Sequence, residues 1–426
     1  MSSAVFVNPL MYIRAVAARV AQSGSGAPTV RSSPRPDLLR ELTEQEVLET
    51  IFREGPITRP EIAARMNLSK PTVSAAVSRL EQADLVHPAG PREGRRGRKP
   101  MSYVVSNKAG FVVGLDIGGT NVRVAAADMY GEIVCEDKQA TAKEGSRAAS
   151  AQMIELVDGA IHAARAGHGE PLALGISTPG VVDQSTGQVI SLAYNVSPDG
   201  GFDPASAIGR RFGFPVLVEN NVNLAAVGEA WNGLARGIST FAFMSIGAGV
   251  GMGISIDDEL VRGAHGAAGE VCYLPGGSDP FDRRHRLHGA LEDAVGEAGI
   301  LASLGEQDWD GSAPTTAREV FELADAGSEP ANAIVERVAR HIGVAIATVC
   351  AIVDPELVVL GGGIGSNAAL LRPVRSTVAA LAPIPARIET SLLGDEASLH
   401  GAIAIALRQA RELFFSQRGA QAAARA

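Results

Sequence analysis

Aromatic residues and cysteines are both scarce in this sequence. Aromatic side chains make up 4% of its 426 residues, and the three cysteines, Cys135, Cys272 and Cys350, stand far apart without a Cys-x-x-Cys pair. This usage argues against a disulfide-stapled secreted scaffold and favours buried thiols in a reducing cytoplasm. Long hydrophobic runs are missing too, so no segment reaches transmembrane length and no membrane partner is expected. The amino-terminal stretch lacks the basic region of a signal peptide.

An excess of positive charge is also absent. The net charge of −9 argues against a protein that coats nucleic acid along its whole surface, although a small basic module stays possible. A 46% hydrophobic share and 48 glycines are typical of a globular α/β chain, long enough for two or three domains. From composition and from the positions of glycine and proline we predict a disordered tail at 1–36, a small domain at 37–107, a larger domain at 111–412 and a flexible tail at 413–426.

Three helices are predicted in the amino-terminal module. Capping boxes, in which a Ser or Thr and a Glu three residues later bond to each other's backbone N–H, begin the first two helices at Thr43 and Thr58. Ser69 is expected to cap the third. The apolar residues of that helix, at helical spacing, are Val73, Val77 and Leu80. A strand from 85 and a return strand at 103–105 would complete a winged helix-turn-helix.

The third helix would present short polar and small side chains on its open face, which lets a helix lie deep in a major groove. A glycine-flanked basic loop at 91–100 would form the wing and neutralise phosphates or enter a minor groove. The predicted DNA-contacting residues are Ser69, Lys70, Thr72, Ser74, Ala75, Arg79, Arg95, Arg96 and Arg98. The alternative is a small helical domain that uses its basic loop for protein contacts.

Three apolar strands in the remainder of the chain lead into glycine-rich turns. The first passes through Asp116 into Gly118-Gly119-Thr120, where backbone N–H groups can approach a phosphate without a Cβ in the way. The other two lead into the turns at 247–249 and 361–363. Alternating strands and helices with such turns indicate an α/β protein with two lobes around a ligand site. Taken alone, the first turn also fits an ordinary β-hairpin.

The motifs together resemble those of the ROK family (repressor, open reading frame, kinase). They are Asp-Ile-Gly-Gly-Thr at 116–120, Ser-Thr-Pro-Gly at 177–180, Glu-Asn-Asn-Val-Asn at 219–223, Gly-Ala-Ala-Gly-Glu at 266–270 and the triple glycine at 361–363. The resemblance spans about residues 37–412 and implies a two-lobed actin-like ATPase (RNase H-like) fold of the sugar-kinase type. The winged helix resembles that of the family's sugar-responsive transcription factors, and the family's sugar kinases lack it.

Two departures from the family pattern imply that kinase chemistry is lost. In the family's kinases an aspartate general base follows Glu-Asn, but Asn221 stands there, and an amide cannot take the proton from a sugar hydroxyl. Ala248 replaces a threonine of the second glycine turn, which removes a hydroxyl donor. No catalytic residue is therefore predicted. The remnant of the phosphate loops is Asp116, Gly118, Gly119, Thr120, Gly247 and Gly249.

The family's zinc site is predicted to be absent, and no other cofactor is expected. By the resemblance, the four ligand positions hold Tyr273, Arg283, His285 and Ala290. This set does not make a tetrahedral zinc site, and His285 is expected to be a surface histidine. The groups that would bind the hydroxyls of a sugar or other effector are Asn220, Asn221, Glu270 and Glu292. The alternative is that Glu270 caps a local turn and Glu292 merely starts a helix.

The sequence thus predicts a cytoplasmic, sugar-responsive repressor with a catalytically degenerate kinase-like domain. Its expected partners are operator DNA with an inverted repeat, a small sugar or sugar phosphate, and copies of itself in a homodimer or homotetramer. An effector would act by binding the DNA-bound and free states with different affinity. Two alternatives stay open: an active ATP-dependent sugar kinase with an attached DNA-binding domain, and a regulator whose effector site is vestigial.

Overall fold

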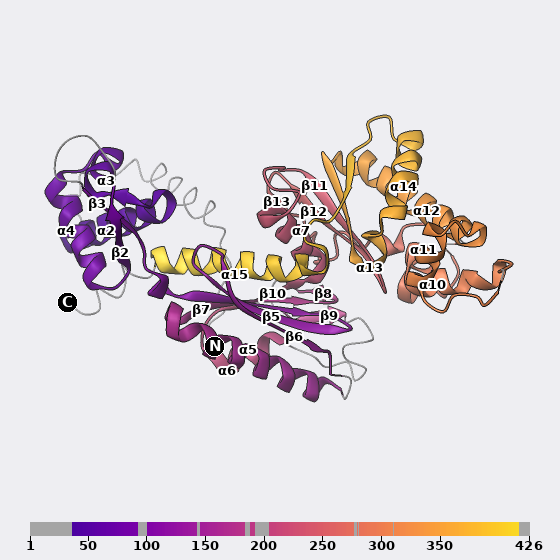
Figure 1. Cartoon of the computed structure of the whole chain (residues 1–426), viewed down its shortest axis with the longest axis horizontal. Coiled ribbons are helices and arrows are strands. Elements are labelled where there is room, and N and C mark those ends of the chain that lie inside the picture. Colours follow the sequence, from indigo (N-terminus) through magenta and orange to yellow (C-terminus); the bar gives the residue numbers. More distant parts are fainter. Residues whose placement is uncertain are drawn as a thin grey trace, which may run out of the picture.

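The computed structural model describes residues 36–92, 100–142, 145–183, 188–191, 204–276, 279, 281–309 and 311–416. Figure 1 shows a small amino-terminal unit followed by two larger lobes, with helix α15 (Ala397–Ser416) lying along the first lobe from the side of the amino-terminal unit to the second lobe. The predicted tail at 1–36 lies outside the described residues except for Pro36, as do 417–426. None of the helices in the described ranges combines the length and apolar character needed to cross a membrane.

The amino-terminal unit, called the winged helix below, contains three helices and a small antiparallel sheet of order β1-β3-β2. Its elements are α2 (Pro36–Glu54), β1 (Ile57–Thr58), α3 (Arg59–Met66), α4 (Lys70–Gln82), β2 (Val86–Pro91) and β3 (Met101–Val105). The capping box at Thr58 and the cap at Ser69 are confirmed, since each hydroxyl accepts the backbone N–H three residues on. Val73, Val77 and Leu80 are buried as predicted.

The predicted first cap at Thr43 is wrong, because α2 already begins at Pro36. Proline is favoured in the first turn of a helix, where its missing N–H costs little. No glycine or proline interrupts residues 37–54, so the helix runs through Thr43. The Thr-x-x-Glu spacing therefore occurs here inside a helix rather than at its start.

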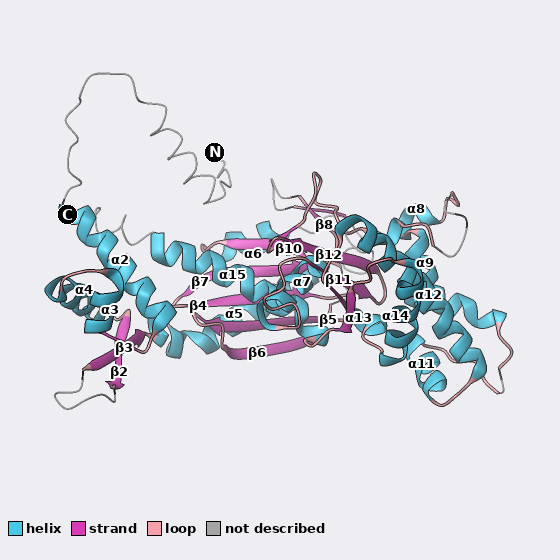
Figure 2. Ribbon diagram, turned by 90° about the horizontal axis from the view of Figure 1, so that it is seen from above, coloured by secondary structure: helices cyan, strands magenta, loops and turns pink. Residues whose placement is uncertain are grey.

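The first lobe is built on a five-stranded sheet of order β10-β7-β4-β5-β6. Strands β4, β7 and β10 are parallel, and β5 and β6 continue the sheet antiparallel. Helices α5 and α6 cover one face and α15 the other (Figure 1), and Figure 2 shows the strands side by side. The elements are β4 (Phe111–Ile117), β5 (Asn121–Asp128), β6 (Ile133–Ala140), α5 (Ser146–His168), β7 (Pro171–Thr178), β8 (Val181–Val182), β9 (Val189–Ser191), α6 (Pro204–Phe212) and β10 (Val216–Asn220).

The second lobe carries a sheet of order β13-β12-β11-β14-β15. A large core between this sheet and α9, α11, α12 and α14 fills one face, and α7 (Asn221–Asn232) packs on the other. The elements are β11 (Phe241–Ile246), β12 (Val250–Ile256), β13 (Glu259–Leu260), α8 (His285–His288), α9 (Ala290–Val295), α10 (Glu297–Ala302), α11 (Ala317–Asp325), α12 (Glu329–Val353), β14 (Leu357–Gly361), α13 (Gly362–Gly365), α14 (Ala368–Leu381) and β15 (Arg387–Thr390).

The end of the chain departs from the prediction. Residues 413–416, assigned to a flexible tail, are the last turn of α15. Phe414 is only 6% exposed and belongs to the same hydrophobic cluster as Leu48 and Ile51 of α2. Burial of an aromatic side chain against another domain outweighs the cost of ordering one more helical turn. Helix α15 therefore links the lobes to the winged helix.

Candidate functional site

The open face of α4 is the candidate DNA-binding surface. Ser69, Lys70, Thr72 and Ala75 are exposed there, as the sequence predicts. Ser74 and Arg79 are only partly exposed, and each has an intramolecular partner. The side chain of Arg79 forms an ion pair with Glu44 of α2. Of the predicted wing residues, Arg95, Arg96 and Arg98 lie outside the described residues.

Arg59, which sequence reasoning missed, holds α4 in place. Its Nη1 donates to Ser74 Oγ at 2.9 Å, and its Nη2 donates to Glu81 Oε2 at 3.2 Å. The guanidinium also lies over the ring of Tyr103, 5.0 Å from the ring centroid. Arg59 thus joins the first turn of α3 to α4 and to β3. No local spacing signals this role, because its partners are 15 to 44 residues away in the sequence.

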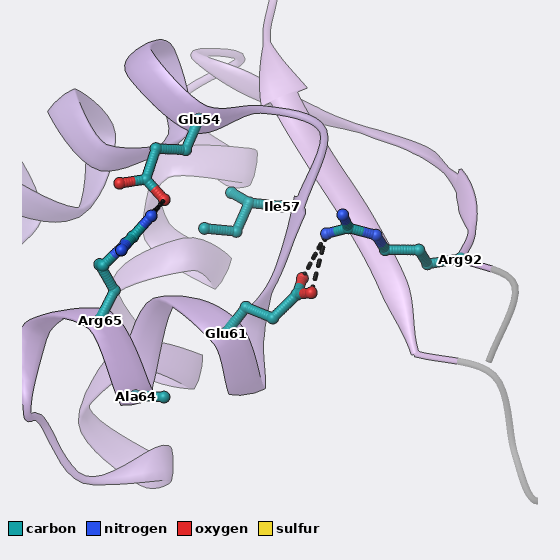
Figure 3. A pocket seen from close by; sticks show the side chains of 6 residues that line it. All are labelled: Glu54, Ile57, Glu61, Ala64, Arg65 and Arg92. Atoms are coloured by element: carbon teal, nitrogen blue, oxygen red, sulfur yellow. Dashed lines mark hydrogen bonds and ion pairs between the residues drawn. The ribbon is translucent and has the colours of Figure 1, made fainter. Parts of the chain in front are cut away.

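A hollow of about 460 Å³ lies on the winged helix beside α3 (Figure 3). Two ion pairs border it: Arg65 with Glu54, and Arg92 with Glu61, both at 2.8 Å. Glu61 also closes the capping box with Thr58, and hydrogen bonds from Thr58 together with Arg92 lower the pKa of Glu61. Exposed pairs of this kind contribute roughly 0 to 1 kcal/mol. Glu61 therefore tethers the base of the wing weakly, so Arg92 can exchange this carboxylate for a phosphate.

The second candidate site lies where the parallel strands of the first lobe end. Asp116 on β4 pairs in register with Ser177 on β7, and Ser177 Oγ donates to Asp116 Oδ1 at 2.6 Å. Arg123 Nη1 lies 3.8 Å from the other carboxylate oxygen. Burial raises the pKa of Asp116 to about 6, although Ser177 and Arg123 oppose the shift. The turn that follows leaves Gly119 and Thr120 exposed.

Asn220 and Asn221 stand at the start of α7, between the lobes. The Oδ1 atom of Asn220 accepts from the backbone N–H groups of Val222 (2.8 Å) and Asn223 (3.1 Å), so Asn220 is the helix cap. Its Nδ2 donates to the carbonyl of Gly180 at 2.9 Å. Among the described residues, the second N–H of this amide has no hydrogen-bond acceptor. Asn221, the first helical residue, is partly exposed.

An ion pair between Glu219 and Arg262 crosses from one lobe to the other. Arg262 Nε donates to Glu219 Oε2 at 2.6 Å, and the Glu219 side chain is only 5% exposed. The other carboxylate oxygen accepts from Asn223 Nδ2 at 3.1 Å. The Glu-Asn-x-x-Asn motif contains both residues, but it gives no sign of the arginine. The pair fixes β10 and the start of α7 against the segment that leads to Glu270.

The carboxylates of Glu270 and Glu292 both lie close to Cys272. Glu292 Oε2 accepts from the N–H of Val250 at 2.9 Å, next to the second glycine turn. Glu270 makes no capping hydrogen bond with its own turn, and Cys272 Sγ donates to it at 3.6 Å. Burial raises the pKa of both glutamates, and burial with their negative charges raises the pKa of Cys272 to about 12. The cysteine is thus an unreactive thiol beside two partly buried acceptors.

The remaining residues of the predicted phosphate loops lie in the second lobe. Gly247 and Gly249 close a tight turn after β11, with the N–H of Gly247 donating to the carbonyl of Gly249 at 2.9 Å. Ala248 in that turn is exposed. Strand β14 runs parallel to β11, so its triple-glycine turn lies at the same sheet edge. The first lobe and the second lobe therefore each present glycine turns at the carboxyl ends of parallel strands.

The prediction that His285 is a surface histidine is wrong. Its side chain is 8% exposed, and its Nδ1 lies 2.6 Å from Asp293 Oδ2, because the turn at Gly289 folds α8 back onto α9. At the other three positions that align with the family's zinc ligands, Tyr273 is 55% exposed, Arg283 is exposed and Ala290 is buried. An alanine side chain has no ligand atom and an arginine stays protonated, so this set does not fit a zinc ion. Within the described ranges, no three His, Cys, Asp or Glu side chains gather as a metal site would require.

Comparison with known proteins finds a matching family model for each of the two domains. The ROK family model matches residues 112–409, and a winged helix-turn-helix DNA-binding model matches 40–87. The xylose repressor of Caldicellulosiruptor bescii is 28% identical over 389 residues, which are 87% of this chain and 96% of the relative. The glucokinase of Halalkalibacterium halodurans is 29% identical over 312 residues, which are 68% of this chain and 93% of the relative.

Solved structures agree with this division. A ROK family transcriptional regulator, a homologue of the E. coli MLC protein, aligns with a TM-score of 0.70 at 20% identity over 90% of this chain and all of its own. A ROK hexokinase from Thermus thermophilus aligns with a TM-score of 0.59 at 28% identity over 71% of this chain and 99% of its own. The fold predicted from the sequence is confirmed, and the chain belongs to the ROK family, as a DNA-binding regulator in which a winged helix-turn-helix precedes a two-lobed sugar-kinase-like domain.

Proposed function

We propose that the protein is a sugar-responsive transcriptional repressor whose kinase-like domain binds a sugar without phosphorylating it. The observation that carries this proposal is Asn221 at the start of α7, in a chain that also has a complete winged helix. The similarity to a xylose repressor extends over 87% of this chain, whereas that to a glucokinase extends over 68%, about the share of the kinase-like domain. Both points favour regulation over catalysis.

The chemistry of the site suits a neutral polyol. Glu270 and Glu292 are partly buried acceptors, and burial penalises their charged forms. A sugar hydroxyl that donates to either carboxylate would offset part of this penalty. The free N–H of Asn220 and the amide of Asn221 would bind further hydroxyls. Because Asn221 cannot act as a general base, the bound sugar would leave unchanged.

The DNA half of the proposal is tested first. Full-length protein is used to select duplexes from a random pool at low salt, and the selected sequences are aligned. We expect an inverted repeat with half-sites one or more helical turns apart, bound by a homodimer or homotetramer, as light scattering of the complex would report. Recovery of no enriched sequence at any salt concentration would refute the role in DNA recognition.

The sugar half is tested with the selected operator. D-xylose, D-glucose and N-acetyl-D-glucosamine are titrated into the protein–operator complex and followed by fluorescence anisotropy. One of them is expected to weaken binding by about fivefold or more. In parallel, protein with ATP and each sugar should yield no sugar phosphate. Sugar-dependent ATP turnover that Asp116→Ala abolishes would instead establish the kinase alternative, and no sugar effect would favour a vestigial site.

A further inference from the structure

The turn between β5 and β6, residues 129–132, contacts the winged helix and also the two helices α7 and α15. Phe52 of α2 stacks on Tyr130 of this turn, with ring centroids 5.1 Å apart. Tyr130 Oη accepts from the backbone N–H of Val105 at the end of β3. Three N–H groups of the turn donate to Asp128 Oδ1 at 2.9 to 3.0 Å, so the turn itself is rigid.

Arg411 of α15 lies over the same contact. Its Nη2 donates to the carbonyl of Met129 at 2.8 Å, and its guanidinium lies 4.8 Å from the centroid of the Phe52 ring. One side chain of α15 therefore contacts both the turn and the winged helix. A partly buried cation over an aromatic face is attracted by the negative face of the ring, so the contact favours this position of the winged helix.

Helix α7 reaches this turn from the other side. The ring of Trp231, near its carboxyl end, lies against Gly131, where a Cβ would approach the ring to 2.5 Å. The other end of α7 is Asn221, in the candidate sugar site. A helix of 12 residues spans about 18 Å, so one rigid element connects the two.

The two helices are also packed backbone to backbone. A Cβ on Gly401 of α15 would lie 1.9 Å from the carbonyl oxygen of Leu224, and one on Gly228 of α7 would lie 2.1 Å from that of Ala397. Helices in such close contact cannot slide independently, because interiors are as densely packed as crystals. A shift of the first turn of α7 would thus move α15 as well.

We propose that α7 and α15 transmit the state of the sugar site to the winged helix through the turn at 129–132. Arg411 is the residue that couples this turn and α15 to the winged helix. This inference rests on the proposed function, since it requires a ligand at the start of α7. A ligand that moves this end of α7 changes the surface on which Phe52 and Tyr130 are stacked. The orientation of α4 relative to a second copy of the chain on DNA would then change with it.

The test compares two arginines of the same helix. Arg411→Gln removes the charge and the planar fork, and Arg408→Gln makes the same change at an exposed position. With the selected operator and the effective sugar, we expect wild type and Arg408→Gln to show the same ratio of operator affinities without and with sugar. In Arg411→Gln this ratio should fall to within about twofold of one. Sugar affinity without DNA and operator affinity without sugar should stay within about threefold of wild type.

A second arm needs no sugar. Amide hydrogen exchange of α2 residues 47–52 should be about tenfold faster in Arg411→Gln than in wild type, because the contact of Arg411 with the Phe52 ring is lost. Exchange should be unchanged in Arg408→Gln. Phe52→Leu, which keeps apolar volume but removes the ring, should reproduce both effects if Arg411→Gln folds poorly. If Arg411→Gln and Phe52→Leu both keep the wild-type effect of sugar on operator affinity and the wild-type rate of hydrogen exchange, the inference is overturned. If no sugar shifts the wild type, the proposed function fails, and the exchange arm alone decides whether Arg411 holds the winged helix.

Discussion

Ionisation of the buried Asp116 carboxyl should destabilise the folded protein at neutral pH, a contribution that is absent at pH 4. Its side chain is 6% exposed in the protein, and its acid–base equilibrium is displaced from the usual pKa of 3.8 to about 6. Asp116→Asn is the informative substitution, because the amide oxygen can still accept from Ser177 Oγ. Arg123 keeps a second partner in Asp395, so the change leaves no orphaned charge.

The sign follows from proton linkage. Since the folded carboxyl binds its proton more tightly than the unfolded one, the native state holds more protons between pH 4 and 6, and the free energy of unfolding falls as pH rises through that window. The penalty is absent below about pH 4 and complete above about pH 6. A difference of about two pKa units corresponds to about 3 kcal/mol. Asp116→Asn should therefore stabilise the protein by about 2 to 3 kcal/mol at pH 7.5 and have little effect at pH 4.

Urea unfolding monitored by circular dichroism at pH 4, 5, 6 and 7.5 measures this difference. Asp158→Asn, at a partly exposed aspartate that forms a surface ion pair with Arg211, is the control and should change stability by less than about 1 kcal/mol at each pH. A variant Asp116→Asn that is less stable than wild type at pH 7.5, or whose advantage does not shrink toward pH 4, would refute the reasoning. The confirmed result would identify a group kept at a cost in stability, as functional sites often require.

Three further outcomes test other contacts. Arg262→Met leaves the buried carboxylate of Glu219 without its ion-pair partner and should lower the free energy of unfolding in urea by about 2 to 3 kcal/mol. Arg165→Met, at an exposed pair, should lower it by less than about 0.5 kcal/mol, and equal losses would contradict the inter-lobe pair. Glu44→Gln frees Arg79 for phosphate, so anisotropy at low salt should show about threefold tighter binding to non-specific duplex, fading as salt rises. Glu270→Gln should weaken sugar binding by roughly 1 to 3 kcal/mol in calorimetry with operator affinity unchanged, and equal sugar affinity would point to a vestigial site.

Short-range patterns were the part of the fold that could be predicted. The cap at Ser69 and the box at Thr58 depend on residues three apart, and both were found where the sequence placed them. The same spacing gave a wrong prediction at Thr43, because it also occurs inside a helix that begins earlier in the sequence. Strand-to-glycine turns indicated the α/β lobes for the same reason, since each is a contiguous motif.

Contacts between distant segments could not be predicted. Arg59 with Ser74, Arg79 with Glu44 and Arg262 with Glu219 each join residues 15 to 43 positions apart, and no periodicity specifies such partners. These contacts also decide which predicted residues are available to a ligand: Arg79 is partly neutralised, whereas Thr72 is exposed. The family resemblance supplied the candidate groups, but their burial and pairing came only from the packing of the lobes.

Asn220 shows why a site without a catalytic base can still be useful. Because its side-chain oxygen caps α7, a ligand that binds its remaining N–H binds the end of the helix itself. The helix then carries any displacement toward Trp231 and the turn on which the winged helix rests. A kinase would also need a base at position 221 to use such a ligand, whereas a regulator needs only a difference in ligand affinity between two arrangements. In the proposed regulator, Asn221 in place of a base would remove the reaction and leave the mechanical path intact.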